Sequence, residues 1–236
     1  MEFQIKDRYD INDLLKIIEM LRDPENGCPW DKVQTHLSIR KNFIEETYEA
    51  IEAIDLDDKE LMQEELGDVL MQILLHAQFE AEQRVFDFAD VVNGTAQKLV
   101  LRHPHIFAGF DNKTVDGVLQ KWDEIKQEEK GQKTVTETLE AVPKSFPALM
   151  YAQKLNKRAV AGGLVKNDAA DIADSLQATL DTIKAKLNSG ENCGEDIGRL
   201  LYAASTLAGA TKNDAEEVLG FENAKMLEYL KKLDNK

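Results

Sequence analysis

The sequence predicts an all-α protein, and three observations point to that class. Apolar residues recur three or four positions apart along most of the chain, as on one face of an amphipathic helix. A polar run at 55–58 separates two such stretches and predicts a turn between antiparallel helices. The second stretch, 61–83, is apolar on nearly all sides, which is typical of a buried helix at the centre of a bundle.

Length and charge limit the classes of protein. The 236 residues suffice for one large or two small domains with a sizeable core. The net charge of -15 argues against a nucleic-acid polymer as partner, although a bound cation would still admit a nucleotide. No apolar run opens the chain, and Cys28 and Cys193 lie too far apart to indicate a disulfide framework. We therefore expect a cytoplasmic protein with no membrane segment.

The first half of the chain supplies three expected helices. The first covers 10–22, where isoleucine and leucine side chains repeat at helical spacing. The loop at 23–30 contains proline and glycine and carries Trp30, a residue that either covers the core or contacts a ligand. Helices over 38–54 and 61–83 then form the antiparallel pair.

The remaining elements follow the same period. A helix over 88–101 begins after Asp87, which has the side chain of an N-cap, and another helix covers 114–130. Residues 131–147 hold prolines, glycine and threonines with few large apolar side chains, as a linker does. We expect two units of four or five helices, with a first domain at 1–130, a linker at 131–147 and a second domain at 148–236.

The chemistry concentrates in residues 45–68. Glu46 and Glu49 are three positions apart, as are Glu65 and Asp68, so each pair lies on one face of its helix. On antiparallel helices the four carboxylates would converge, and they would repel one another without a cation between them. Oxygen-only ligands favour a hard cation, either Mg²⁺ or Mn²⁺.

A solvated acidic face is the simpler explanation for such a stripe, and it fits the first helix, whose apolar residues occupy the opposite arc. The second helix argues for a metal, because the run from Val69 to Phe79 has no charged side chain. Acids on a buried helix need a partner. A metal is one such partner, and a buried lysine or arginine is the alternative.

The acids also carry a family resemblance. The pattern Glu46-x-x-Glu49 followed by Glu65-x-x-Asp68 resembles the MazG family of nucleoside triphosphate pyrophosphohydrolases, an all-α group. The stretches at 27–31 (Gly-Cys-Pro-Trp-Asp) and 102–107 (Arg-His-Pro-His-Ile-Phe) resemble two further motifs of that family. Three motifs in the same order make the resemblance specific.

The resemblance implies an activity, a cofactor and a set of residues. Such enzymes hydrolyse nucleoside triphosphates to the monophosphate and pyrophosphate with Mg²⁺, and they usually act as homodimers. The basic pair four positions apart in the fourth helix would hold the triphosphate, and further residues would lie near the nucleotide. The implied site comprises the metal ligands Glu46, Glu49, Glu65 and Asp68 and the substrate contacts Lys98, Arg102, Trp30, Trp122 and Lys126. Glu45 and Glu64 are candidates for the general base, and the sequence does not choose between them.

The second domain resembles a decayed copy of the first. The stretch 196–199 (Asp-Ile-Gly-Arg) stands where 65–68 has Glu-Leu-Gly-Asp, and tandem units are known in this family. Arg199 replaces the expected aspartate, and the upstream acids would fall near Ser175 and Thr179. We expect a structural or regulatory domain that binds no metal.

Other classes remain open from the sequence. A non-catalytic helical adaptor or oligomerisation protein would have the same acids in solvent, and a pyrophosphatase specific for dUTP or dCTP would use the same carboxylates. A di-iron bundle needs Glu-x-x-His, and no histidine here follows that pattern. The residues specify neither the base and sugar preference nor the choice between removing damaged nucleotides and controlling an alarmone.

Overall fold

The structure is a computed structural model that describes residues 3–109 and 114–234. The fold is all-α, as predicted, because every regular element within those two ranges is helical. The chain divides into two compact units, Met1–Thr114 and Val115–Lys236. No helix in the described ranges combines the length and apolarity needed to cross a membrane.

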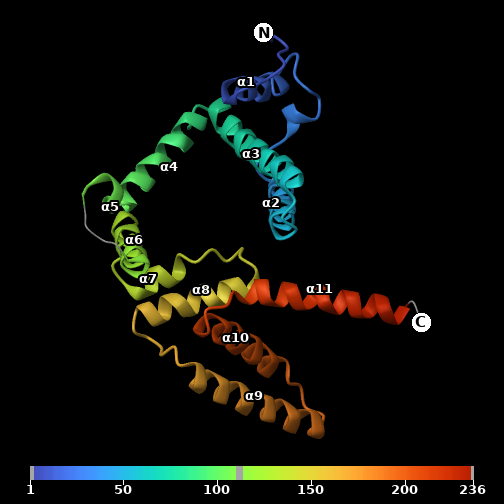
Figure 1. Cartoon of the computed structure of the whole chain (residues 1–236), viewed down its shortest axis with the longest axis vertical. Helices are drawn as coiled ribbons and strands as arrows, with labels where there is room; N and C mark the ends of the chain where they lie inside the picture. Colours follow the sequence, from blue (N-terminus) through green and yellow to red (C-terminus); the bar gives the residue numbers. More distant parts are fainter. Residues whose placement is uncertain (1–2, 110–113, 235–236) are drawn as a thin grey trace. The chain divides into compact units, whose positions relative to one another are not determined.

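The first unit follows the predicted order of helices. Those predicted over 10–22, 38–54, 61–83 and 88–101 are confirmed, with ends that shift by one or two residues. Two of them begin with capping boxes, at Asp10 and at the predicted N-cap Asp87. The elements are α1 (Ile11–Leu21), the short 3-10 helix η1 (Asp31–Val33), α2 (Arg40–Asp55), α3 (Lys59–Glu82), α4 (Phe88–Arg102) and α5 (Pro104–Phe107) (Figure 1).

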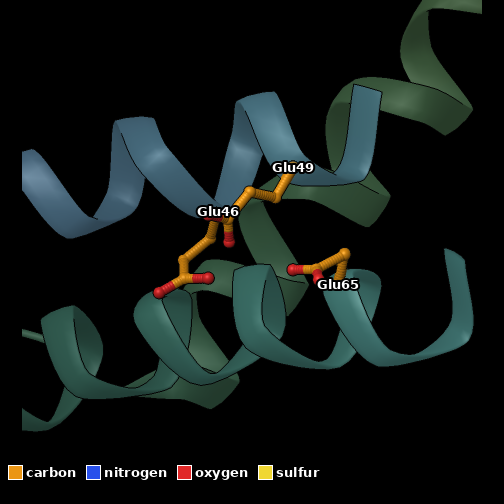
Figure 2. Close-up of side chains that lie close together, drawn as sticks. All are labelled: Glu46, Glu49 and Glu65. Atoms are coloured by element: carbon orange, nitrogen blue, oxygen red, sulfur yellow. The ribbon is translucent and has the colours of Figure 1, made fainter. Parts of the chain in front are cut away.

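Helices α2 and α3 form the predicted antiparallel pair and lie side by side (Figures 1 and 2). The turn between them is short, and Asp57 takes a left-handed conformation there with φ of 54°. The carboxylate of Asp58 accepts hydrogen bonds from the backbone N–H groups of Glu60 and Leu61, which fixes the start of α3. A tight, capped turn sets the register between the two helices.

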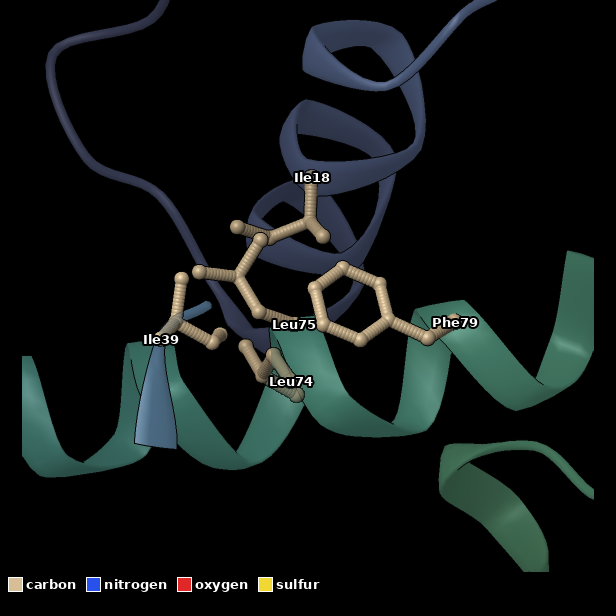
Figure 3. Packing of buried hydrophobic residues seen from close by; sticks show 5 residues of the cluster. All are labelled: Ile18, Ile39, Leu74, Leu75 and Phe79. Atoms are coloured by element: carbon tan, nitrogen blue, oxygen red, sulfur yellow. The ribbon is translucent and has the colours of Figure 1, made fainter. Parts of the chain in front are cut away.

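The core of the first unit lies against the C-terminal half of α3, where α1 and the residue before α2 pack on it (Figure 3). The guanidinium of Arg22 lies 4.2 Å from the ring centre of Phe79 and donates two hydrogen bonds to Glu82. These contacts anchor the C-terminal half of α3. The buried apolar residues of this cluster are Ile18, Ile39, Leu74, Leu75 and Phe79.

Glycine is required in the loop that follows α1. A Cβ atom on Gly27 would lie 2.4 Å from the carbonyl oxygen of Asp23 and 2.6 Å from that of Leu21. The next residue, Cys28, donates its backbone N–H to Leu21 across 2.8 Å. The loop therefore folds back onto the helix it leaves.

In the second unit, α9 and α10 form another antiparallel pair (Figure 1). Helix α10 also packs on α8, and α11 contacts both α8 and α10. The side chain of Gln153 joins α8 to the start of α11, because it donates to Asn213 O and accepts from Ala215 N. The elements are α6 (Val115–Glu129), α7 (Val135–Glu140), α8 (Ala148–Ala161), α9 (Ala169–Ser189), α10 (Gly194–Ala210) and α11 (Ala215–Asp234).

The segment predicted as a linker, 131–147, contains the helix α7, which packs on α8. The sequence did not indicate this helix because a capping box between Thr134 and Glu137 starts it, without a long apolar stripe. Helix α6 belongs to the second compact unit. The predicted domain limits of 1–130 and 148–236, and the tandem relation of the two units, remain predictions.

Candidate metal centre

The predicted metal ligands come from two helices that face each other. Glu46 and Glu49 lie on α2, and Glu65 and Asp68 lie on α3. Residues three apart share one face of a helix, and the capped turn at 56–58 brings those faces together. The site is thus built by the helix pair itself.

Three of the four predicted ligands meet. Glu46, Glu49 and Glu65 each offer one carboxylate oxygen, and these three atoms lie within 4.8 Å of one another (Figure 2). Glu65 is buried, Glu46 is half-buried and Glu49 is exposed, so the group opens from the helix interface to solvent. Asp68 lies outside this close group, and its place as a fourth ligand remains a prediction.

The electrostatics of the cluster show a deficit of positive charge. Burial raises the pKa of Glu46, and the charges of Asp68, Glu49 and Glu65 raise it further. Burial also raises the pKa of Glu65, followed by the charges of Glu49, Asp68 and Glu64. The Oε2 atom of Glu65 is buried and has no hydrogen-bond partner in the described part of the chain. A cation among these oxygens would offset both burial and repulsion.

Gln72 was not predicted as a site residue. Its Oε1 atom is buried without a hydrogen-bond partner among the described residues, as is the Oε2 of Glu65. It follows Asp68 by one helical turn and Glu65 by two, so the three lie along one face of α3. The signal in the sequence was an amide four residues after Asp68, in a run without charges.

The structure places the predicted substrate contacts on different elements of the chain. Trp30 is 56% exposed, so it does not cover the core. Lys98 is exposed and Arg102 half-buried on α4, which begins beside the end of α3 and leads away from the α2–α3 pair (Figure 1). Trp122 and Lys126 are half-buried on α6, in the second unit. Their contacts with a nucleotide remain predictions.

A second group of titratable side chains lies next to the core of the first unit. The Nδ1 atoms of His36 and His76 are 2.7 Å apart, and Nε2 of His36 is 2.8 Å from Oε1 of Glu80. The two rings stack with centres 4.9 Å apart. Burial lowers the pKa of His76, and the nearby His36 lowers it further. The group fastens the chain before α2 to α3.

The predicted counterpart in the second unit is chemically different. Asp196 is 2% exposed, and its carboxylate accepts hydrogen bonds from Lys186 at 2.5 Å and Arg199 at 3.2 Å. Arg199 also pairs with Glu195, and it lines a hollow together with Ser175. The bond from Lys186 is the main cause of a lowered pKa at Asp196. Cationic side chains satisfy this buried acid.

The fold and the acid cluster define a class: an all-α protein whose paired helices can hold a divalent cation. The family model described as the MazG nucleotide pyrophosphohydrolase domain matches residues 34–107, which include α2, α3 and α4. The chain also resembles curated proteins along most of its length. A protein of Escherichia coli (strain K12), named nucleoside triphosphate pyrophosphohydrolase, is 38% identical over 91% of this chain and 83% of its own length.

Two further relatives extend the comparison. The nucleoside triphosphate pyrophosphohydrolase/pyrophosphatase MazG of Thermotoga maritima is 36% identical over 94% of this chain and 84% of its own length. The uncharacterized protein YabN of Bacillus subtilis is 46% identical over 63% of this chain and 30% of its own length. This chain belongs to the MazG family.

Proposed function

We propose that this chain is a nucleoside triphosphate pyrophosphohydrolase, which cleaves its substrate to the monophosphate and pyrophosphate. The observation that carries the proposal is the cluster of Glu46, Glu49 and Glu65 within 4.8 Å, with a buried oxygen of Glu65 left without a partner. Membership of the MazG family supports the same reaction.

The residues present fit a divalent cation. The donors are all oxygens, which suit Mg²⁺ or Mn²⁺. Glu46, Glu49 and Glu65 would hold the ion, with Asp68 as the fourth ligand. When bound, it would neutralise phosphate oxygens and orient the phosphate chain.

The reaction needs a base and a partner for the leaving group. A water oxygen attacks the α-phosphorus, the bond from that phosphorus to the α–β bridging oxygen breaks, and pyrophosphate leaves. The proton of the water passes to Glu45 or Glu64. Glu45 pairs with Lys41 at 2.7 Å, and Glu64 precedes Glu65 on α3. Lys98 and Arg102 would stabilise the departing pyrophosphate.

The second unit is a structural or regulatory domain in this proposal. Its buried acid Asp196 already has Lys186 and Arg199 as partners. These two side chains offset the negative charge of the carboxylate, so it does not need a metal cation. We treat it as a degenerate MazG-like unit on that ground and on the match of 196–199 with 65–68.

A second copy of the chain is the expected partner. Helix α2 carries an apolar stripe on its exposed side, and each of its four members is about half exposed. An apolar stripe of this kind is typical of a face that another helix covers. The stripe consists of Ile44, Tyr48, Ile51 and Ile54. The acidic charge and the two free cysteines, Cys28 and Cys193, accord with a cytoplasmic enzyme.

Product analysis tests the proposal. The common ribo- and deoxyribonucleoside triphosphates are each incubated with the chain in Mg²⁺, in Mn²⁺ and in EDTA. Metal-dependent release of pyrophosphate and monophosphate is expected, and relative rates report base preference, including any restriction to dUTP or dCTP. Release of orthophosphate would mean attack at the γ-phosphorus and would contradict the mechanism. No turnover in either metal would leave a helical adaptor as the better account.

A further inference from the structure

The second unit contains a hollow of about 310 Å³ that lies apart from its α9–α10 pair. Its walls are the end of α6, residues 132–138, and the last turns of α8. All three segments belong to one compact unit, so the hollow is formed within it.

The lining is strongly basic in a chain that is acidic. The full sequence has 44 acidic side chains against 29 lysines and arginines. The hollow nevertheless has five cationic residues on its walls and no aspartate or glutamate among the described residues that line it. The five are Lys126, Lys133, Lys154, Lys157 and Arg158.

Among the described residues, three of these lysines form no ion pair with an acid, whereas four lysines elsewhere in this unit do. Lys184, Lys186, Lys225 and Lys231 each form an ion pair with an aspartate or a glutamate. Among the described residues, the side chains of Lys133, Lys154 and Lys157 form none. Like charges gathered without counter-charges repel one another, and an anion would offset that repulsion.

Helix α7 carries the acid Glu137, whose carboxylate caps the start of its own helix. The carboxylate of Glu137 accepts hydrogen bonds from the backbone N–H groups of Lys133 at 2.6 Å and Thr134 at 2.9 Å. These bonds lower the pKa of Glu137 and hold its charge at the helix cap. Glu137 is not among the residues that line the hollow, and within the described residues it forms no ion pair with a lysine there.

The frame of the hollow is closely packed. Arg158 donates a hydrogen bond to the carbonyl oxygen of Thr138 and so ties α8 to α7. A Cβ atom on Gly162 would lie 2.4 Å from the Cγ1 of Val135, so only glycine permits this approach. The separation of α7 and α8 is thus set by this hydrogen bond and by the contact of the Val135 side chain with Gly162.

We infer that this hollow binds a polyphosphate anion directly, without a metal, either as pyrophosphate or as the phosphate chain of a nucleotide. Several ammonium groups from different segments can each contact a different phosphate oxygen, and Gln132 and Thr134 add neutral donors. A single orthophosphate would reach fewer of them. Lys154 and Lys157 also line a neighbouring hollow, whose lining includes Asp214. Lys126, Lys133 and Arg158 line only the basic hollow.

Calorimetric titration of the full chain with pyrophosphate in EDTA tests the inference. Without a cation the acid cluster of the first unit repels anions, so binding under these conditions reports on the basic hollow. The test variant is Lys133→Ala with Lys157→Ala, which alters two different walls. The control is Lys225→Ala with Lys231→Ala on α11, which removes the same charge from lysines outside the hollow.

We expect saturable binding to the unaltered chain, a loss of affinity of about 10-fold or more in the test variant, and little change in the control. Orthophosphate should bind more weakly than pyrophosphate. Tighter binding of ATP than of tripolyphosphate would identify a nucleotide as the ligand, and equal binding would identify the phosphate chain alone.

The inference would be overturned by no saturable binding, by an equal loss in test and control variants, or by equal affinity for orthophosphate and pyrophosphate. The Lys98→Ala/Arg102→Ala variant separates this site from the proposed active site, because it removes the basic pair proposed to hold pyrophosphate there. It should bind pyrophosphate in EDTA as the unaltered chain does, whether or not the chain hydrolyses triphosphates. Loss of binding in that variant would assign the anion to Lys98 and Arg102 and contradict the inference.

Discussion

Lys186 lies with its ammonium 2.5 Å from the carboxylate of Asp196, a residue buried on α10. When the stretch 196–199 is aligned with 65–68, Asp196 corresponds to Glu65 of α3, which is also buried. In the described part of the chain its Oε2 atom has no hydrogen-bond partner, and the charged groups that raise its pKa are all acids. The α9–α10 pair thus holds a buried acid that a lysine side chain neutralises, whereas the α2–α3 pair holds a buried acid with no such partner among the described residues.

Glu65→Gln should stabilise the protein when no divalent cation is present. The raised pKa of Glu65 means that the native state favours its protonated form. Stability from this group is therefore full below the unfolded value of 4.5 and is lost as pH rises through the native value. In EDTA at neutral pH the variant should have a higher Tm, and it should gain less from Mg²⁺ than the unaltered chain.

The measurement is thermal unfolding at several pH values, with EDTA or with Mg²⁺. Glu52→Gln is the matched control, because it removes an exposed acid of α2 that lies outside the cluster. A variant at Glu65 that is less stable than the unaltered chain in EDTA at neutral pH would contradict the expected repulsion.

Glu49→Gln should abolish turnover while the helical circular dichroism spectrum is retained. The side chain is exposed and makes no contact with the core, so the substitution removes a ligand without disturbing the packing. Removal of an outer partner of a metal ligand lowers activity by ~10–100-fold, so loss of a direct ligand should cost at least about 100-fold. Activity is measured as pyrophosphate release in Mg²⁺, again with Glu52→Gln as control. Retained turnover in Glu49→Gln would exclude it as a metal ligand.

The sequence predicted the helices and the acid cluster because both follow from local periodicity. Glu46, Glu49 and Glu65 could be found from spacing alone once the turn at 55–58 made the helices antiparallel. The short helix α7 was missed because its start depends on a cap at Thr134. The contact of His36 with His76 could not be predicted, because it joins residues 40 positions apart through the packing of a loop.

Replacing Glu195 by Gln and Asp196 by Asn together should leave the turnover of folded protein within about twofold of the unaltered value. The second unit holds no acid cluster comparable to that of the first among the described residues. The double variant should nevertheless be less stable, because Lys186 and Arg199 lose their charged partner. Rates are therefore measured per folded molecule. A loss as large as that of Glu49→Gln would place the second unit in the reaction.

The stability contributed by Asp196 should depend on pH in the opposite sense to that of Glu65. Its pKa is lowered by the hydrogen bond from Lys186, so the contribution is present above the unfolded value of 3.8 and is lost as pH falls through the native value. Acid unfolding of the unaltered chain and of Asp196→Asn should converge at low pH. Curves that stay parallel would contradict a charged Asp196 in the native state.

His76 should make the protein less stable in mild acid. One of the two facing Nδ1 atoms of His36 and His76 must donate and the other accept, so protonation of both breaks the bond. The lowered pKa of His76 means that the unfolded chain takes up a proton first as pH falls below 6.5, and stability decreases until the native value is reached. His76→Phe should flatten the dependence of the free energy of unfolding between about pH 7.5 and about pH 5. The control is His105→Gln, which removes a histidine of α5; equal slopes in both variants would exclude His76.

The basic residues of α4 and the acids of the α2–α3 pair lie on different helices, and this predicts an active site shared between two copies of the chain. Lys98 and Arg102 lie towards the end of α4, which leads away from the α2–α3 pair that carries Glu49 (Figure 1). If a second copy covers the apolar stripe of α2, the two sets can meet across the dimer, and each active site then takes residues from both chains. Inactive Glu49→Gln and inactive Lys98→Ala/Arg102→Ala proteins, unfolded together and refolded as a mixture, should regain activity. Random pairing gives half mixed dimers with one intact site each, so roughly a quarter of the unaltered activity is expected. Absence of recovery, with mixed dimers demonstrated by differently tagged chains, would place all of these residues within one chain.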